Sequence, residues 1–223
     1  MTQTEATRAR LKAAIVAIAP AVLLAGFAWH PYTAVPDEAT IAATVATGMT
    51  RWGLSHLTIA VGSGLTALAF IAIRSYLRDA SDERWSVLAL PLIVMGSNLF
   101  AILPGMEFAA LAAAETGASV EAVQTALFPW FVPILLTGGI TFGLGVLGFA
   151  RGIADSQVLR RGVTRLVVVA LIGMAAARFV PLGAVQFYLQ GAAGIVALWP
   201  LSYEMWKHPE ARPAAQPRPV PAT

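Results

Sequence analysis

The stretch that decides the fold is Ala122–Ala150, AVQTALFPWFVPILLTGGITFGLGVLGFA, which contains no charged residue. A helix that crosses a bilayer needs about 20 mostly apolar residues, so this stretch is long enough to cross. The whole chain of 223 residues has the same character, with 57% hydrophobic and 12% charged residues. Soluble domains carry about 25% charged residues. The sequence therefore predicts an integral membrane protein and excludes a soluble enzyme, a coiled coil and a disordered chain.

Other uncharged stretches predict five further spans. We expect transmembrane helices at about 12–29, 53–75, 85–106, 122–150, 163–180 and 182–205. The fifth is the weakest, because its uncharged part is only Leu166–Ala177 and it reaches bilayer length only if flanking arginines extend to the interfaces. The expected fold is an all-α, six-transmembrane-helix bundle, one domain over residues 1–206. The proline-rich segment 207–223 is expected to be a disordered cytoplasmic tail.

The basic residues predict the orientation. Thirteen of the fifteen Lys and Arg residues fall on one side of these spans, and only Arg51 and Arg178 fall on the other. Because positive residues stay on the cytoplasmic side, both termini are expected in the cytoplasm and the protein in the plasma membrane. The same residues mark loops, so no nucleic-acid partner is expected. The alanine- and arginine-rich composition is typical of bacterial multi-pass proteins.

An alternative reading concerns the first span. The basic residues before it and the small residues of Gly26–Ala28 also resemble a secretory signal with a cleavage site. The sequence leaves open whether the first span is retained.

Two helical segments are expected outside the bilayer. Residues 36–38, Pro-Asp-Glu, favour the start of a short helix with an apolar stripe at Ile41, Val45 and Met49. The third and fourth spans continue as helix beyond the bilayer, with a turn at 116–118 and Ser119 as N-cap of the fourth. Together these segments predict a small extracytoplasmic helical cap.

Polar residues within the expected spans concentrate in the outer third, where they are candidate ligand-binding residues. They are His30, His56, Asn98, Glu107, Arg178, Gln186 and Gln190. Intramembrane polar residues are the default markers of function, and no polar path continues to the inner face, which argues against a pump or channel. We expect an outward-facing pocket that binds a small apolar or amphipathic ligand, in transport or sensing. The alternative is that these residues only anchor helices at the interface.

Two pairs among these residues are singled out. His30 ends the first span and His56 lies one turn into the second, with small residues beneath both, so haem ligation in a membrane-embedded redox protein is an alternative function. His56 is expected to point inward, toward the amides at similar depth. The chain has no cysteine, and no third intramembrane histidine or close carboxylate, so no metal site is expected. Glu107 and Arg178 are expected to form an ion pair or else to face lipid head groups.

The sequence indicates less about partner proteins and catalytic residues than about the fold. Gly139 and Gly143 form a GxxxG pattern that favours close helix packing within the bundle, with a homo-oligomer seam as the alternative. A non-catalytic accessory subunit bound to a membrane partner protein is a third possible function. No nucleotide-binding or metalloprotease motif occurs, so no catalytic residue is assigned.

Overall fold

The computed structural model describes residues 3–32, 37–80, 84–180 and 183–209. All regular structure in these ranges is α-helical. The helices are α1 (Gln3–Trp29), α2 (Glu38–Thr47), α3 (Met49–Ala80), α4 (Arg84–Thr116), α5 (Val120–Ser156), α6 (Arg161–Ala177) and α7 (Gly183–Lys207). Pro36, Pro181 and Leu182, which the sequence places in connections, and most of the expected tail, residues 210–223, lie outside the described residues.

Five helices, α1, α3, α4, α5 and α7, are long and apolar enough to cross a membrane. The predicted fold class is confirmed to this extent: the described chain is a helical bundle of the kind found in multi-pass membrane proteins. The fifth expected span, 163–180, corresponds to α6, which is only 17 residues long. α6 is the shortest of the helices expected to span: it begins at Arg161, after the connection that follows α5, and ends at Ala177, four residues before Pro181.

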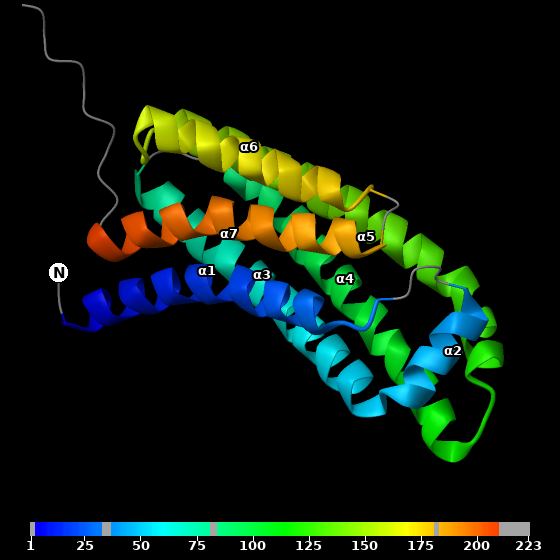
Figure 1. Cartoon of the computed structure of the whole chain (residues 1–223). Helices are drawn as coiled ribbons and strands as arrows, with labels where there is room; N and C mark the ends of the chain where they lie inside the picture. Colours follow the sequence, from blue (N-terminus) through cyan, green and yellow to red (C-terminus); the bar gives the residue numbers. More distant parts are fainter. Residues whose placement is uncertain (1–2, 33–36, 81–83, 181–182, 210–223) are drawn as a thin grey trace, which may run out of the picture.

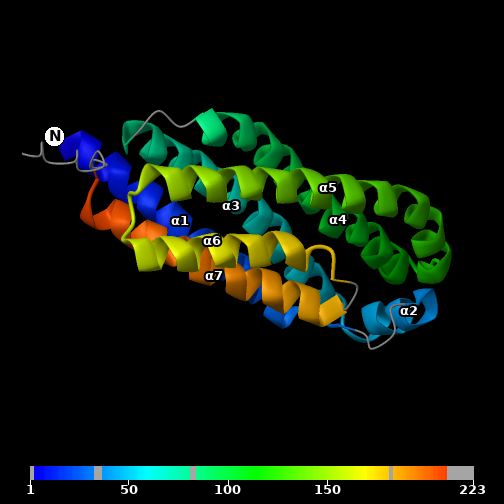
Figure 2. The ribbon, with the colours of Figure 1, turned by 90° about the horizontal axis from the view of Figure 1, so that it is seen from above.

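The six longer helices pack as a closed ring in the order α1, α3, α4, α5, α6, α7 and back to α1. Figures 1 and 2 show the short α2 at one end of this ring, beside the hairpin of α4 and α5. The start of α1 and the end of α7 lie together at the opposite end (Figure 1). We call these the α2 end and the terminal end.

The interior of the ring is filled by side chains. Aromatic residues of α3 and α5 meet across it, with the Phe70 and Phe149 ring centroids 4.8 Å apart and both rings fully buried. Closer to the α2 end a second apolar cluster contains Phe27 and Phe100, and a third lies beneath α2 around Val45. The bundle is therefore a packed core and not an open channel.

Small residues allow the closest helix contact, between α4 and α5. A Cβ atom added to Gly96 would lie 2.5 Å from the backbone nitrogen of Phe142, and one added to Gly145 would lie 2.8 Å from the backbone nitrogen of Ile93. Gly139 and Gly143 instead face the ring of Phe179 in the same chain, at ordinary contact distance. The GxxxG pattern thus accommodates an aromatic side chain.

The expected helical segments beyond the spans are present. Asp37 caps α2, with its Oδ1 accepting a hydrogen bond of 2.8 Å from the Thr40 backbone N–H. Ser119 caps α5 in the same way at 3.1 Å from the Ala122 nitrogen, after a turn in which Gly117 has φ +73°. α4 and α5 contain 33 and 37 residues, so at about 1.5 Å per residue both exceed the bilayer's roughly 30 Å of hydrocarbon. α4, the turn and α5 form the expected helical hairpin, although α5 ends at Ser156 and not at Ala150. Its position outside the bilayer stays a prediction.

Candidate functional site

Two histidines meet at the α2 end. His30 follows the last residue of α1, and His56 lies in the second turn of α3. Their Nε2 atoms are 3.2 Å apart, and His56 Nδ1 lies 2.7 Å from the backbone oxygen of Trp52. Since a carbonyl oxygen only accepts, His56 carries its proton on Nδ1 when neutral. His56 Nε2 then accepts a hydrogen bond from the Nε2–H of His30.

The other ring nitrogen of His30 has no such partner. His30 Nδ1 is buried and lacks a hydrogen bond, and so does the hydroxyl of Tyr32, whose ring centroid lies 4.6 Å from that of His30. Burial lowers the pKa of His30 to about 3, and the charges of His56 and Arg51 act in the same direction. Burial also raises the pKa of Tyr32. Both side chains are therefore neutral at pH 7.

Aromatic rings continue from the histidines into the ring of helices. Tyr32 stacks on Phe187 of α7, with centroids 5.7 Å apart, and Phe187 contacts Phe27 of α1 at 4.9 Å and Phe100 of α4 at 6.5 Å. We call Phe27, Phe100 and Phe187 the aromatic plug. Because it draws on three helices, the plug fills the ring interior just below the histidine pair.

Arg178, at the C-cap of α6, extends into the interior of the ring. Its side chain is only 7% exposed, and its guanidinium carbon lies 3.6 Å from the Phe142 ring centroid and 4.3 Å from that of Phe100. Nη1 makes long hydrogen bonds of 3.5 and 3.4 Å to the backbone oxygens of Gly96 and Gly138. Nε has no partner. Among the described residues, no carboxylate forms an ion pair with this guanidinium.

Two glutamines on α7 differ in their surroundings. Gln186 donates from Nε2 to the backbone oxygen of Arg178 at 3.2 Å. Gln190, one turn further along, is 1% exposed, and neither its amide oxygen nor its amide nitrogen has a hydrogen-bond partner. Ser97 Oγ on α4 is also buried without a partner. Buried polar atoms normally find partners, so Gln190 and Ser97, like Nε of Arg178, are unsatisfied positions in the interior of the bundle.

Glu107 and Asn98 lie apart from this region. Glu107 Oε2 accepts a hydrogen bond of 2.7 Å from Gln124 Nε2, which links α4 to α5. The ion pair expected between Glu107 and Arg178 is thus replaced by separate partners for each residue. Asn98 is exposed on α4, while the neighbouring Ser97 faces inward. The structure brings together His30 with His56 and Gln186 with Arg178, and it leaves Asn98 outside.

The sequence analysis missed several residues of this region. Trp52, Tyr32 and the aromatic plug surround the histidines, and Gly96 and Gly138 provide the carbonyls that face Arg178. Trp52 and His56 are four residues apart on one helix, so they share a face, and this spacing is the signal that identifies Trp52. Nothing in the spacing identifies the two glycines, which lie on different helices.

The arrangement of the two histidines does not suit haem. Two axial imidazoles approach the iron from opposite faces of the porphyrin, so the porphyrin has to lie between the rings. Here the two nitrogen atoms are in direct hydrogen-bond contact, and their rings meet edge to face at 66°. Within the described ranges, no group of three or more His, Cys, Asp or Glu side chains lies close enough to hold a metal ion.

Two surface grooves of the bundle lie away from these residues. One, of about 520 Å³, runs between α4 and α5 from Trp85 to Arg151, and the other, of about 630 Å³, runs between α1 and α7. None of the seven candidate residues lines either groove.

Comparisons of this chain with protein families, curated proteins and solved structures find no match.

Proposed function

We propose that this protein is a six-span bundle of a bacterial plasma membrane that binds a small amphipathic ligand inside the ring at its α2 end. In this proposal both termini are cytoplasmic and the α2 end faces outward, for transport or sensing. The common position of the start of α1 and the end of α7 supports an even number of spans. The thirteen basic residues on that side support its cytoplasmic orientation.

The observation that carries the proposal is the isolated guanidinium of Arg178. Burying a charged group costs several kcal/mol unless a counter-charge and hydrogen bonds offset the loss of water. Two long carbonyl contacts and the faces of Phe100 and Phe142 offset part of this cost. The free Nε–H remains unsatisfied. An anionic group on a ligand would provide the missing acceptor and the missing charge.

The surroundings of Arg178 define the rest of the ligand. The phenylalanine rings beside the guanidinium favour an apolar chain. On α7, one turn beyond the glutamine that bonds the Arg178 backbone oxygen, the unpartnered amide of Gln190 offers a further donor and acceptor. An amphipathic carboxylate combines these properties. Because the aromatic plug fills the interior, binding requires its rings to move apart, and Phe187 would carry that displacement to α7. Coupling of this kind suits a sensor.

A binding experiment with matched probes tests the proposal. The purified protein in lipid nanodiscs is titrated with decanoate and with decanol, and its thermal midpoint is measured. We expect decanoate to raise the midpoint by several degrees and decanol to have little effect, since only the carboxylate pairs with Arg178. Arg178→Gln should abolish the response, whereas Arg165→Gln, which removes an exposed charge from the same helix, should preserve it.

Two results of these titrations would contradict the proposal. Equal shifts with both probes would show that apolar contact alone stabilises the protein and would overturn the proposal. A retained decanoate response in Arg178→Gln would do the same. Size-exclusion profile and helical content are recorded for both variants, so that loss of binding is separated from loss of fold.

The accessory-subunit function remains a prediction from the sequence. It requires a membrane partner protein; a seam between two copies at Gly139 and Gly143 would require Phe179 of the same chain to leave these glycines. Co-purification in mild detergent distinguishes it from the ligand-binding proposal, because an accessory subunit keeps its partner through purification.

A further inference from the structure

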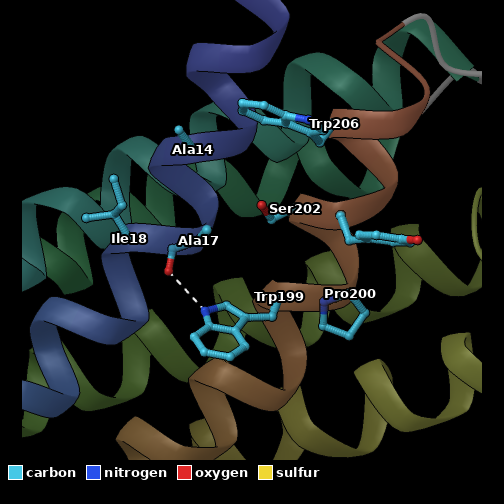
Figure 3. Close-up of a pocket in the computed structure, with 8 residues that line it drawn as sticks. Ala14, Ala17, Ile18, Trp199, Pro200, Ser202 and Trp206 are labelled. Atoms are coloured by element: carbon cyan, nitrogen blue, oxygen red, sulfur yellow. Dashed lines mark hydrogen bonds between the residues drawn. The ribbon is translucent and has the colours of Figure 1, made fainter.

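The groove between α1 and α7 lies in the terminal half of the bundle, several turns of α1 away from the histidine pair. Small residues of α1 form one wall and aromatic residues of α7 form the other (Figure 3). The lining residues are Ala14, Ala17, Ile18, Trp199, Pro200, Ser202, Tyr203 and Trp206. With a volume of about 630 Å³, the groove is large enough for part of an acyl chain.

The polar atoms of the groove are already used by contacts between its walls. Trp199 donates from Nε1 to the backbone oxygen of Ala17 at 3.1 Å, as Figure 3 shows, and Ser202 donates to the backbone oxygen of Ala13 at 2.8 Å. These bonds hold α7 against α1 and fix the indole of Trp199, which is 52% exposed. The surface left for an occupant is therefore aliphatic and aromatic.

Two cations lie on the aromatic rings at the terminal end of this groove. The guanidinium carbon of Arg10 is 5.8 Å from the ring centroid of Trp206, and Nζ of Lys207 is 4.5 Å from that of Tyr203. The nearby acid Glu204 interacts with His208 at 3.5 Å, and Glu5 has an interaction of its own. Neither cation has a described ion pair with an acidic residue.

We propose that this groove binds one anionic phospholipid, with an acyl chain along Ala14 and Trp199 and the phosphate between Arg10 and Lys207. Charge complementarity selects this occupant: basic residues at the cytoplasmic end of a groove between transmembrane helices are the features that recognise anionic head groups. The cation–π contacts hold both basic residues beside the groove before the lipid arrives. The inference concerns the opposite end of the bundle from the ligand site; it rests on the membrane location and orientation proposed above and not on the ligand.

Native mass spectrometry of the intact protein in mild detergent tests the proposal. The probes are phosphatidylglycerol and phosphatidylcholine with identical acyl chains, each titrated separately. We expect the wild-type protein to bind one phosphatidylglycerol at least tenfold more tightly than phosphatidylcholine. Arg10→Gln combined with Lys207→Gln should reduce phosphatidylglycerol binding to the phosphatidylcholine level. Ala14→Phe, which fills the groove, should weaken binding of both lipids.

A control with the same change in charge completes the design. Arg160→Gln combined with Arg161→Gln removes two exposed charges from the same end of the bundle, and we expect it to leave lipid binding unchanged. Equal affinity of the wild-type protein for both lipids would overturn the proposal, as would an equal loss of phosphatidylglycerol in both double variants. A dimer mass that disappears in Ala14→Phe would show a second copy in the groove and would also overturn it.

Discussion

His30 and His56 come from different helices, yet their imidazole nitrogens lie 3.2 Å apart. The backbone oxygen of Trp52 fixes the proton of His56 on Nδ1, so the pair is satisfied only when His30 carries its proton on Nε2. Protonating His30 at Nδ1 would place a charge on a buried nitrogen that has no acceptor. The geometry therefore couples the protonation of His30 to the stability of the α2 end.

The first prediction concerns pH. The folded pKa of His30 is about 3, below its ordinary value of 6.5, so the unfolded chain binds a proton that the folded chain does not. Stability should be constant above pH 6.5 and should fall progressively as the pH is lowered toward 3. Thermal midpoints measured in detergent from pH 8 to pH 4 provide the test.

Two variants test whether His30 causes this dependence of stability on pH. His30→Gln retains an amide donor for His56 Nε2 but does not titrate, so it should make the acid limb shallower. His208→Gln, at the far end of the bundle, should leave that limb unchanged. A midpoint that is equally sensitive to acid in wild type and in His30→Gln would show that other groups are responsible.

The second prediction concerns the cap of α2. Hydrogen bonds from the backbone and side chain of Thr40 hold the pKa of Asp37 below its ordinary value, so the charged cap is favoured in the folded state. This contribution is present at neutral pH and is lost as the pH falls below about 4. Asp37→Ala should speed hydrogen exchange of the amides of α2, while Asp37→Asn, which keeps an oxygen acceptor, should change it less. Equal exchange in all three proteins would contradict the role of the cap.

The sequence predicted the ends of the helices better than their rotation. Asp37, Gly117 and Ser119 have local capping and turn chemistry, which is readable without tertiary contacts. The rotation of α4, which exposes Asn98 and buries Ser97, is not readable in the same way. A membrane helix is apolar on its lipid face as well as on its core face, so hydrophobic periodicity does not identify the buried face.

Arg178 shows that sequence patterns are equally limited in predicting the contacts of the candidate site. Its position at the end of an uncharged run predicts an interfacial residue that extends toward water. The structure places it inside because Gly96 and Gly138 leave carbonyls accessible and Phe142 offers its ring. The two glycines lie 82 and 40 residues away along the chain, so no local pattern reveals them. The placement of both histidines at one end of the bundle was predictable, but their direct contact was not.

The third prediction tests the proposed orientation. The chain contains no cysteine, so single cysteines report cleanly on accessibility. Ala118→Cys, in the hairpin turn, should react with a membrane-impermeant maleimide in intact cells, and Ala154→Cys, near the end of α5, should react only after the cells are opened. Both positions are exposed in the structure. Labelling of Ala154→Cys in intact cells would reverse the orientation.

The last prediction concerns the contact between α4 and α5. A Cβ atom at Gly96 would lie 2.5 Å from the Phe142 nitrogen and 2.7 Å from its Cα atom, and both are backbone atoms that cannot turn aside. Gly96→Ala should therefore force the helices apart and destabilise the protein by about 1–3 kcal/mol. The matched control is Gly105→Ala on the same helix, where nothing lies within 4 Å of the added atom. Because alanine favours helix over glycine by up to about 1 kcal/mol, this control should be neutral or stabilising.

Separating α4 from α5 would also move the Gly96 and Gly138 oxygens away from Arg178, so Gly96→Ala should weaken the decanoate response while Gly105→Ala preserves it. Thermal midpoints with and without decanoate measure both effects, and equal midpoints for the two variants would show that the α4–α5 contact is looser than the structure indicates.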